Sequence, residues 1–343
     1  SVSQVWPPMA NFFANLLGLG NGQNGSSANQ GGGQAVSSSS PQKAPSYSFA
    51  ELQKLYNKLS QFRESDLEKG GGSDVVETVR QITEALIWGE QNDTNFFDFF
   101  CEKSILADFI RVLGLAQAPK KVKVQLLQTL SILVQNIRRQ TSLYYLLSGN
   151  YVNRLIMIPL DFSDEEILAY YITLLKSLAM RLDSETIKFF FIQHPTTTFP
   201  LYSEATRFFD HRDQMVRAAV RTITLQVYKV DDRAMQRYVL RHAKDLYFHQ
   251  LTSHLRDLWV LFNTASQSAT GEEDLANLQH RDDLQQDLLI YLSDVFDLRV
   301  SELNEVLANR LLHGVMLTLL LPSVAYGSAD NVSNTNAAES GSA

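Results

Sequence analysis

Apolar residues recur three or four positions apart through most of the chain, which predicts amphipathic helices that each bury one face. Alternating apolar and polar runs long enough for a strand are absent from the sequence, so it predicts an all-helical fold. Four apolar stripes are the clearest: Val76, Val79, Ile82 and Leu86; Val124, Leu127, Leu130 and Val134; Leu168, Tyr171, Leu174 and Leu178; Val216, Ala219, Ile223 and Val227.

The four stripes begin at positions 76, 124, 168 and 216, so their spacing is nearly constant. This spacing is close to the roughly 40–47 residues of HEAT and armadillo units. Because each such unit buries its apolar face only against its neighbours, the spacing predicts an armadillo- or HEAT-like α-solenoid. Ser163 and Glu166 precede the third stripe and predict a capping box there.

Composition divides the chain into segments. Residues 271–297 predict a long acidic helix with Leu275, Leu288 and Tyr291 on its apolar side, and another helix is expected near 300–313. The segments are an apolar head (1–18), a Gly/Ser-rich linker (19–46), the helical-repeat domain (47–263), further helices that pack on or extend the solenoid (264–322) and a disordered tail (323–343).

The charge balance and the single cysteine exclude several classes of protein. There are 30 Lys and Arg against 37 Asp and Glu, which disfavours nucleic acid as a partner. Cys101 alone allows no internal disulfide, zinc finger or RING, and it fits a reducing compartment. The sequence has no HExxH, GxSxG or Walker motif and no apolar run that could span a bilayer. We therefore expect no enzyme activity, metal, cofactor or small-molecule substrate.

Four long blocks follow one another along residues 48–262. They are 82–98 (ITEALIWGEQNDTNFFD), 124–153 (VQLLQTLSILVQNIRRQTSLYYLLSGNYVN), 161–178 (DFSDEEILAYYITLLKSL) and 199–230. The last of them contains the tripeptide Phe199, Pro200 and Leu201. In this order, the blocks resemble the FPL-domain family.

The resemblance implies a peripheral membrane protein on the cytosolic face of endosomes, lysosomes or Golgi. It also implies a scaffold or adaptor role in cargo delivery to lysosomes and in autophagy, including mitophagy, with partners from the trafficking, autophagy or ubiquitin machinery. Two alternatives stay open: a RING-less component that assists ubiquitin ligation, and a structural subunit of a membrane-tethering complex. Cys101 is flanked by Phe99, Phe100 and Ile105, so we expect a packing residue rather than a reactive thiol.

Three groups are candidates for binding a protein partner. The tyrosines and asparagines around Gly149 either present a turn to a partner or line the seam between repeats. The acidic residues near position 164 either form a helix-capping turn or a docking surface for a basic peptide. The candidates are Tyr144, Tyr145, Asn150, Tyr151, Asn153, Asp164, Glu165, Phe199, Pro200 and Leu201.

Two further groups are candidates for contact with an anionic membrane surface or an acidic partner. A helix over 233–246 would align four basic residues on one face, either as a contact surface or as an ordinary solvated face. The apolar head could enter a membrane interface or dock in a groove, or it could be a disordered terminus. These residues are Arg233, Arg237, Arg241 and Lys244, and Trp6, Phe12, Phe13, Leu16 and Leu17.

Overall fold

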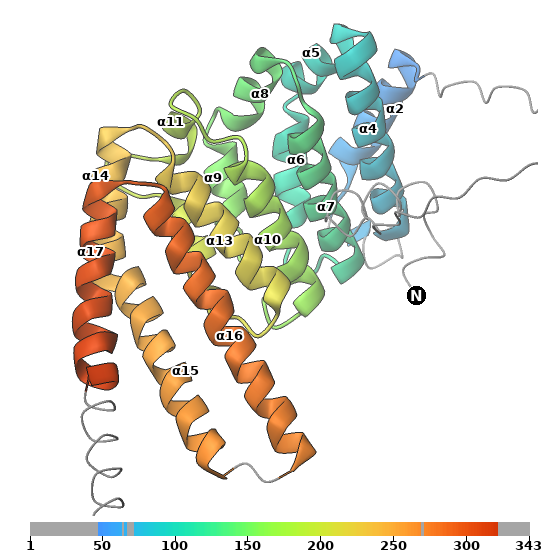
Figure 1. The fold of residues 1–343 in the computed structure, drawn as a ribbon. Helices are drawn as coiled ribbons and strands as arrows, with labels where there is room; N and C mark the ends of the chain where they lie inside the picture. The colour runs from blue at the N-terminus through green and yellow to red at the C-terminus, as the bar shows by residue number, and fades with distance from the viewer. Residues whose placement is uncertain (1–46, 64, 67–71, 269–270, 322–343) are drawn as a thin grey trace, which may run out of the picture. The chain divides into compact units, whose positions relative to one another are not determined.

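The structure of the protein is a computed structural model, and Figure 1 shows its fold. The predicted head, linker and tail, together with the head residues Trp6, Phe12, Phe13, Leu16 and Leu17, lie outside the residues that it describes. Helices make up most of the described part, which also contains an isolated β-bridge between Ile192 and Thr198. The described residues are 47–63, 65–66, 72–268 and 271–321.

The helices follow one another with short connections. The first group comprises α2 (Phe49–Gln61), α4 (Gly72–Asn92), α5 (Thr94–Glu102), α6 (Ile105–Leu113), α7 (Lys120–Asn136), α8 (Gln140–Leu147), α9 (Tyr151–Ile156) and α10 (Glu165–Ala179). The second comprises α11 (Ile187–Phe190), α12 (Pro200–Thr206), α13 (Gln214–Tyr228), α14 (Arg233–His242), η2 (Ala243–Tyr247), α15 (Phe248–Ser268), α16 (Glu272–Asp297), α17 (Ser301–Leu311) and η3 (Leu312–Leu320).

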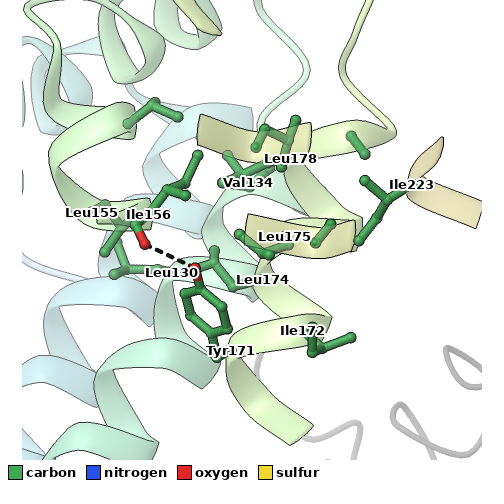
Figure 2. Close-up of a cluster of buried hydrophobic side chains, with 14 of the residues drawn as sticks. Leu130, Val134, Leu155, Ile156, Tyr171, Ile172, Leu174, Leu175, Leu178 and Ile223 are labelled. Atoms are coloured by element: carbon green, nitrogen blue, oxygen red, sulfur yellow. Dashed lines mark hydrogen bonds between the residues drawn. The ribbon is translucent and has the colours of Figure 1, made fainter. Parts of the chain in front are cut away.

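The four predicted stripes lie on α4, α7, α10 and α13, which pack against one another in chain order (Figure 1). Their apolar faces form a continuous core, to which α7 contributes Leu130, α10 contributes Leu174 and α13 contributes Ile223 (Figure 2). The hydroxyl of Tyr171 donates to the carbonyl oxygen of Ile156 at 2.8 Å within this core. The predicted all-α, armadillo-like solenoid is confirmed.

Charged side chains also join neighbouring repeats, because they cap helix ends one repeat away. The guanidinium of Arg181 donates to the carbonyl oxygens of Val134 at 2.7 Å and Ile137 at 3.1 Å, at the end of α7. The guanidinium of Arg111, on α6, likewise donates to the carbonyl oxygen of Phe62, the residue that follows α2, at 2.9 Å. The last carbonyls of a helix have no donor within the helix. These arginines therefore satisfy groups that would otherwise lose a partner on burial.

Glu90 is the acidic counterpart of these arginines. It lies at the end of α4 with only 4% of its surface exposed. Its carboxylate accepts hydrogen bonds from the backbone N–H groups of Arg138 (3.3 Å) and Arg139 (2.8 Å) and from the hydroxyl of Ser142 (3.0 Å). An anion suits the N-terminus of α8, where N–H groups lack intrahelical acceptors. Glu90 thus fixes α8 to the preceding repeat.

The capping box predicted for the third stripe is wrong. The N-cap of α10 is Asp164, whose carboxylate accepts from the N–H groups of Glu166 (3.0 Å) and Ile167 (3.2 Å). The helix begins one residue later than predicted, so the third helical position holds Ile167, which cannot bond back to the cap. Ser163 instead donates its hydroxyl to Asp161 at 2.6 Å.

Helix α16 packs against both α15 and α13, so it continues the core beyond the fourth stripe. Asp287 of α16 forms ion pairs with Arg217 and Arg221 of α13. The hydroxyl of Tyr291 lies 2.8 Å from that of Thr224, also on α13.

The apolar side predicted for α16 is correct only toward its C-terminal end. Leu288 and Tyr291 are buried, whereas Leu275 is 63% exposed. The buried residues of α16 all lie between Gln285 and Val295. Periodicity alone predicts a stripe of full length, but only this part of the helix is covered by neighbours.

Candidate functional site

Helix α14 presents the predicted basic residues on one exposed face. The carboxylate of Asp232 caps the helix by accepting from the N–H of Met235 at 2.7 Å. Met235 and Val239 are buried, which turns the opposite face of α14 outward. That face and the start of η2 carry the basic stripe, which consists of Arg233, Arg237, Arg241 and Lys244, all exposed.

The charges of the basic stripe are not neutralised by the rest of the described chain. None of its four residues makes an ion pair with a described residue. Arg237 donates its Nε only to the carbonyl oxygen of Arg233, at 3.2 Å. Like charges four residues apart on a helix repel one another and destabilise it. The stripe therefore disfavours folding slightly while keeping its donors available to a ligand.

A cavity of about 640 Å³ lies beside the stripe, between α13, α14 and the start of α17. Its floor is apolar and includes the buried side chains of Tyr228 and Leu303. Arg233, Arg237 and Glu302 are among its polar lining residues. The volume falls in the range of roughly 300–1,000 Å³ that is typical of ligand pockets. The cavity thus combines an apolar floor with cationic groups at one side.

Glu302 is the acidic residue of this cavity. Its own backbone N–H and the hydroxyl of Ser301 donate to its carboxylate and lower its pKa, the Ser301 bond measuring 2.8 Å. The carboxylate is therefore ionised at neutral pH. Two arginines against one carboxylate leave the lining with a net positive charge.

The tyrosines and asparagines around Gly149 divide into two kinds. Tyr145 and Asn153 connect helices: the Tyr145 hydroxyl donates to the carbonyl oxygen of Cys101, and the Asn153 amide to that of Phe189 at 2.8 Å. Asn153 is only 2% exposed. These two residues line the seam between repeats and are not free to bind a partner.

The other three residues of this group lie nearer the surface. Tyr144 is half-buried, and the ammonium of Lys188 lies 5.7 Å from the centre of its ring. Asn150 is exposed in a left-handed conformation at the start of α9, and Tyr151 packs partly buried against the core. Tyr144 and Asn150 therefore remain candidates for partner contact.

The tripeptide Phe199, Pro200 and Leu201 is buried, with no exposed area at Phe199 and Leu201. Pro200 occupies the first position of α12, where its missing N–H has no cost. The ring of Phe199 stacks on Tyr202, with 6.1 Å between centroids. The proposal that these three residues contact a partner is thus wrong for this conformation, because they form core.

The carboxylates at the start of α10 form ion pairs with basic side chains of adjacent repeats. The ammonium of Lys120 lies 2.7 Å from Asp164 and 2.9 Å from Glu166. Glu165 forms an ion pair with Arg212, which precedes α13. Exposed pairs of this kind stabilise little. They do, however, use the carboxylates that a basic peptide would need.

Cys101 is partly buried and packs against the core. Burial, followed by the charges of Asp98 and Glu90, raises the pKa of its thiol to about 12. Since the thiolate is the reactive form, such a thiol is a poor nucleophile near neutral pH.

In the part of the chain that the structure describes, no three or more His, Cys, Asp or Glu side chains converge as metal ligands would. Nor does any described helix have the length and apolar character to cross a membrane.

Comparison with known proteins gives the family. Residues 79–228 match the family model FPL, which is described as an uncharacterised conserved protein. The chain carries an FPL domain. The expected resemblance is confirmed, and the FPL domain covers α7, α10 and α13 and most of α4.

Relatives of this FPL protein occur in animals and plants. It is 42% identical to Protein CLEC16A of Mus musculus over 81% of this chain and 27% of the relative. It is 34% identical to Protein TRANSPARENT TESTA 9 of Arabidopsis thaliana over 84% of this chain and 34% of the relative. The chain therefore spans about a quarter to a third of the length of these relatives. The alignment with the mouse protein covers 280 residues, which is longer than the 48–262 block recognised in the sequence.

A designed armadillo repeat protein in complex with the peptide (KR)4 is similar in fold. It aligns over 77% of this chain and 99% of its own, with 14% sequence identity and a TM-score of 0.44.

Proposed function

We propose that this chain is a non-catalytic scaffold that binds other proteins through its helical-repeat surface. The observation that carries the proposal is the exposed basic stripe, which forms no ion pair with a described residue, beside a cavity with an apolar floor. Such a combination offers both charge complementarity and a pocket for an anchoring side chain. The pKa of about 12 at Cys101 disfavours a covalent role for the one thiol of the chain.

We further propose that the scaffold works on the cytosolic face of endosomes, lysosomes or Golgi, in membrane trafficking and autophagy. Family membership supports this proposal, because it is the role that the FPL resemblance implies. The attachment to the membrane would be peripheral, through a partner protein held at the basic stripe.

The test is the distribution of the full chain in fractionated cells. We expect it to co-sediment with endosomal, lysosomal or Golgi markers and to be released by a high-salt wash without detergent. Charge reversal of the stripe (Arg233→Glu, Arg237→Glu, Arg241→Glu and Lys244→Glu) should move most of the protein to the cytosolic fraction.

A matched control makes the same change in charge elsewhere. Lys54, Lys121, Arg138 and Arg154 are exposed and form no ion pair with a described residue. Reversing these four to Glu should leave the distribution unchanged. A wild-type chain that stays wholly in the cytosolic fraction would contradict the proposed function.

A further inference from the structure

The geometry of the basic stripe matches an extended chain. Successive arginines at 233, 237 and 241 are four residues apart on α14. Four residues of α-helix rise about 6 Å. Alternate side chains of an extended peptide are about 6.6 Å apart on one face. A peptide that runs along α14 with acidic residues at every second position can therefore pair each carboxylate with one arginine.

The cavity supplies the second half of the recognition. The hydroxyl of Tyr228 already pairs with that of Tyr202 at 3.0 Å, and Leu303 has no polar side-chain atom, so the floor favours an apolar side chain. Arg233 and Arg237 line the same cavity, which places carboxylate partners next to that side chain. Guanidinium groups bind carboxylates through two parallel hydrogen bonds, which adds geometric specificity to the charge attraction.

We propose that this cavity and the adjoining stripe bind a short acidic peptide segment of a partner protein. One apolar side chain of the segment lies on the cavity floor, and alternate carboxylates pair with Arg233, Arg237 and Arg241. This inference rests on the proposed scaffold function, for which it names the chemistry of the partner.

One observation favours a peptide over an anionic membrane surface. The cavity is concave and its buried lining residues are apolar, which suits an inserted side chain but leaves a flat layer of lipid headgroups without contact to them. Glu302, in the same lining, can accept a backbone N–H of a bound peptide.

The experiment is a selection of random dodecapeptides on the full chain, followed by affinity measurements on the enriched peptides. We expect enriched sequences to carry acidic residues at alternate positions beside an aromatic or large aliphatic residue. Arg233→Glu with Arg237→Glu, which changes the cavity lining, should weaken such a peptide at least about tenfold. Lys121→Glu with Arg138→Glu changes the net charge equally but lies outside the stripe and the cavity, and should weaken it about threefold or less.

Three outcomes would overturn the inference. The selection enriches no peptide, the enriched peptides lack acidic residues, or the two double variants weaken peptide binding equally. Thermal melts of both variants, in which only exposed side chains change, show whether the fold persists.

A parallel measurement uses vesicles of phosphatidylcholine with about a third phosphatidylserine. Vesicle binding that Arg233→Glu with Arg237→Glu reduces more than Lys121→Glu with Arg138→Glu does, without peptide binding, would assign the stripe to membranes. Failure of the peptide selection leaves the organelle association measured above untouched, so the two proposals fail separately.

Discussion

Glu90 joins α4 to the following repeat through a single buried side chain. Its buried carboxylate holds two backbone N–H groups and one hydroxyl of the following repeat. We expect Glu90→Ala to lower the free energy of unfolding by about 2–4 kcal/mol, because three donors lose a charged acceptor within the protein. Urea denaturation measures this change.

The control for this prediction is Asp98→Ala, which removes an exposed carboxylate on the neighbouring α5. It should change the free energy of unfolding by less than about 0.5 kcal/mol. Equal effects of the two substitutions would show that Glu90 does not act through its backbone contacts.

His242 and His254 make stability sensitive to mild acid. Burial is the main cause that lowers the pKa of each ring below its ordinary value. The folded chain therefore keeps the rings neutral where the unfolded chain, with a pKa near 6.5, already takes up protons. The stability that these two neutral rings contribute is fully present above the unfolded pKa. It is lost as the pH falls through that value toward the lower folded pKa.

Thermal melts between pH 7.5 and 5.5 measure this effect. We expect the melting temperature to fall across the interval, and we expect His254→Phe to reduce the fall. A melting temperature that rises on acidification would contradict the assigned direction of the pKa shifts.

At the scale of elements, α16 is held to the repeat through a small polar cluster. Asp287 pairs with Arg217 and Arg221, and both arginines would remain partly or fully buried without it. We expect Asp287→Ala to speed amide hydrogen exchange in α15 and α16 at least several-fold, because a buried charge without a partner is costly. Exchange in α4 and α7 should stay as in the wild type.

Asp294→Ala is the matched substitution, since Asp294 lies on the same helix but is exposed. It should leave exchange in α16 unchanged. Faster exchange spread evenly over every described helix after Asp287→Ala would mean that the cluster stabilises the whole fold rather than this junction.

The sequence predicted the helices of the repeat because their burial follows from apolar spacing alone. Val79, Leu130, Leu174 and Ile223 lie in the core as the stripes indicate. Positions that depend on tertiary neighbours could not be predicted in this way. Leu275 has the right spacing but no covering helix, so it is exposed.

The candidate site was predictable in its charges and not in its cavity. A spacing of four residues places Arg233, Arg237 and Arg241 on one face of any helix. The cavity joins Arg233 and Arg237 to Glu302 and Leu303 of α17, about seventy residues later in the chain. Neither local pattern nor propensity brings these segments together. The burial of Phe199 likewise depends on packing against Tyr202, which the tripeptide alone does not reveal.

At the scale of the whole molecule, most of the polar side chains discussed above bond to another part of the fold. The acidic turn at Asp164 and the seam residues Tyr145 and Asn153 are examples. The basic stripe differs, because four exposed basic residues without ionic partners among the described residues lie together on one face, beside a cavity. This contrast places the proposed partner surface at α14 rather than at the acidic turn.

The assignment of the partner surface to α14 is tested most directly by arginine-directed labelling with phenylglyoxal. The full chain is labelled both free in solution and on isolated organelle membranes. We expect Arg233 and Arg237 to be labelled several-fold less in the membrane-associated protein, while exposed Arg138 and Arg154 react equally in both states. Equal labelling of all four arginines in both states would contradict the assignment of the partner surface to α14.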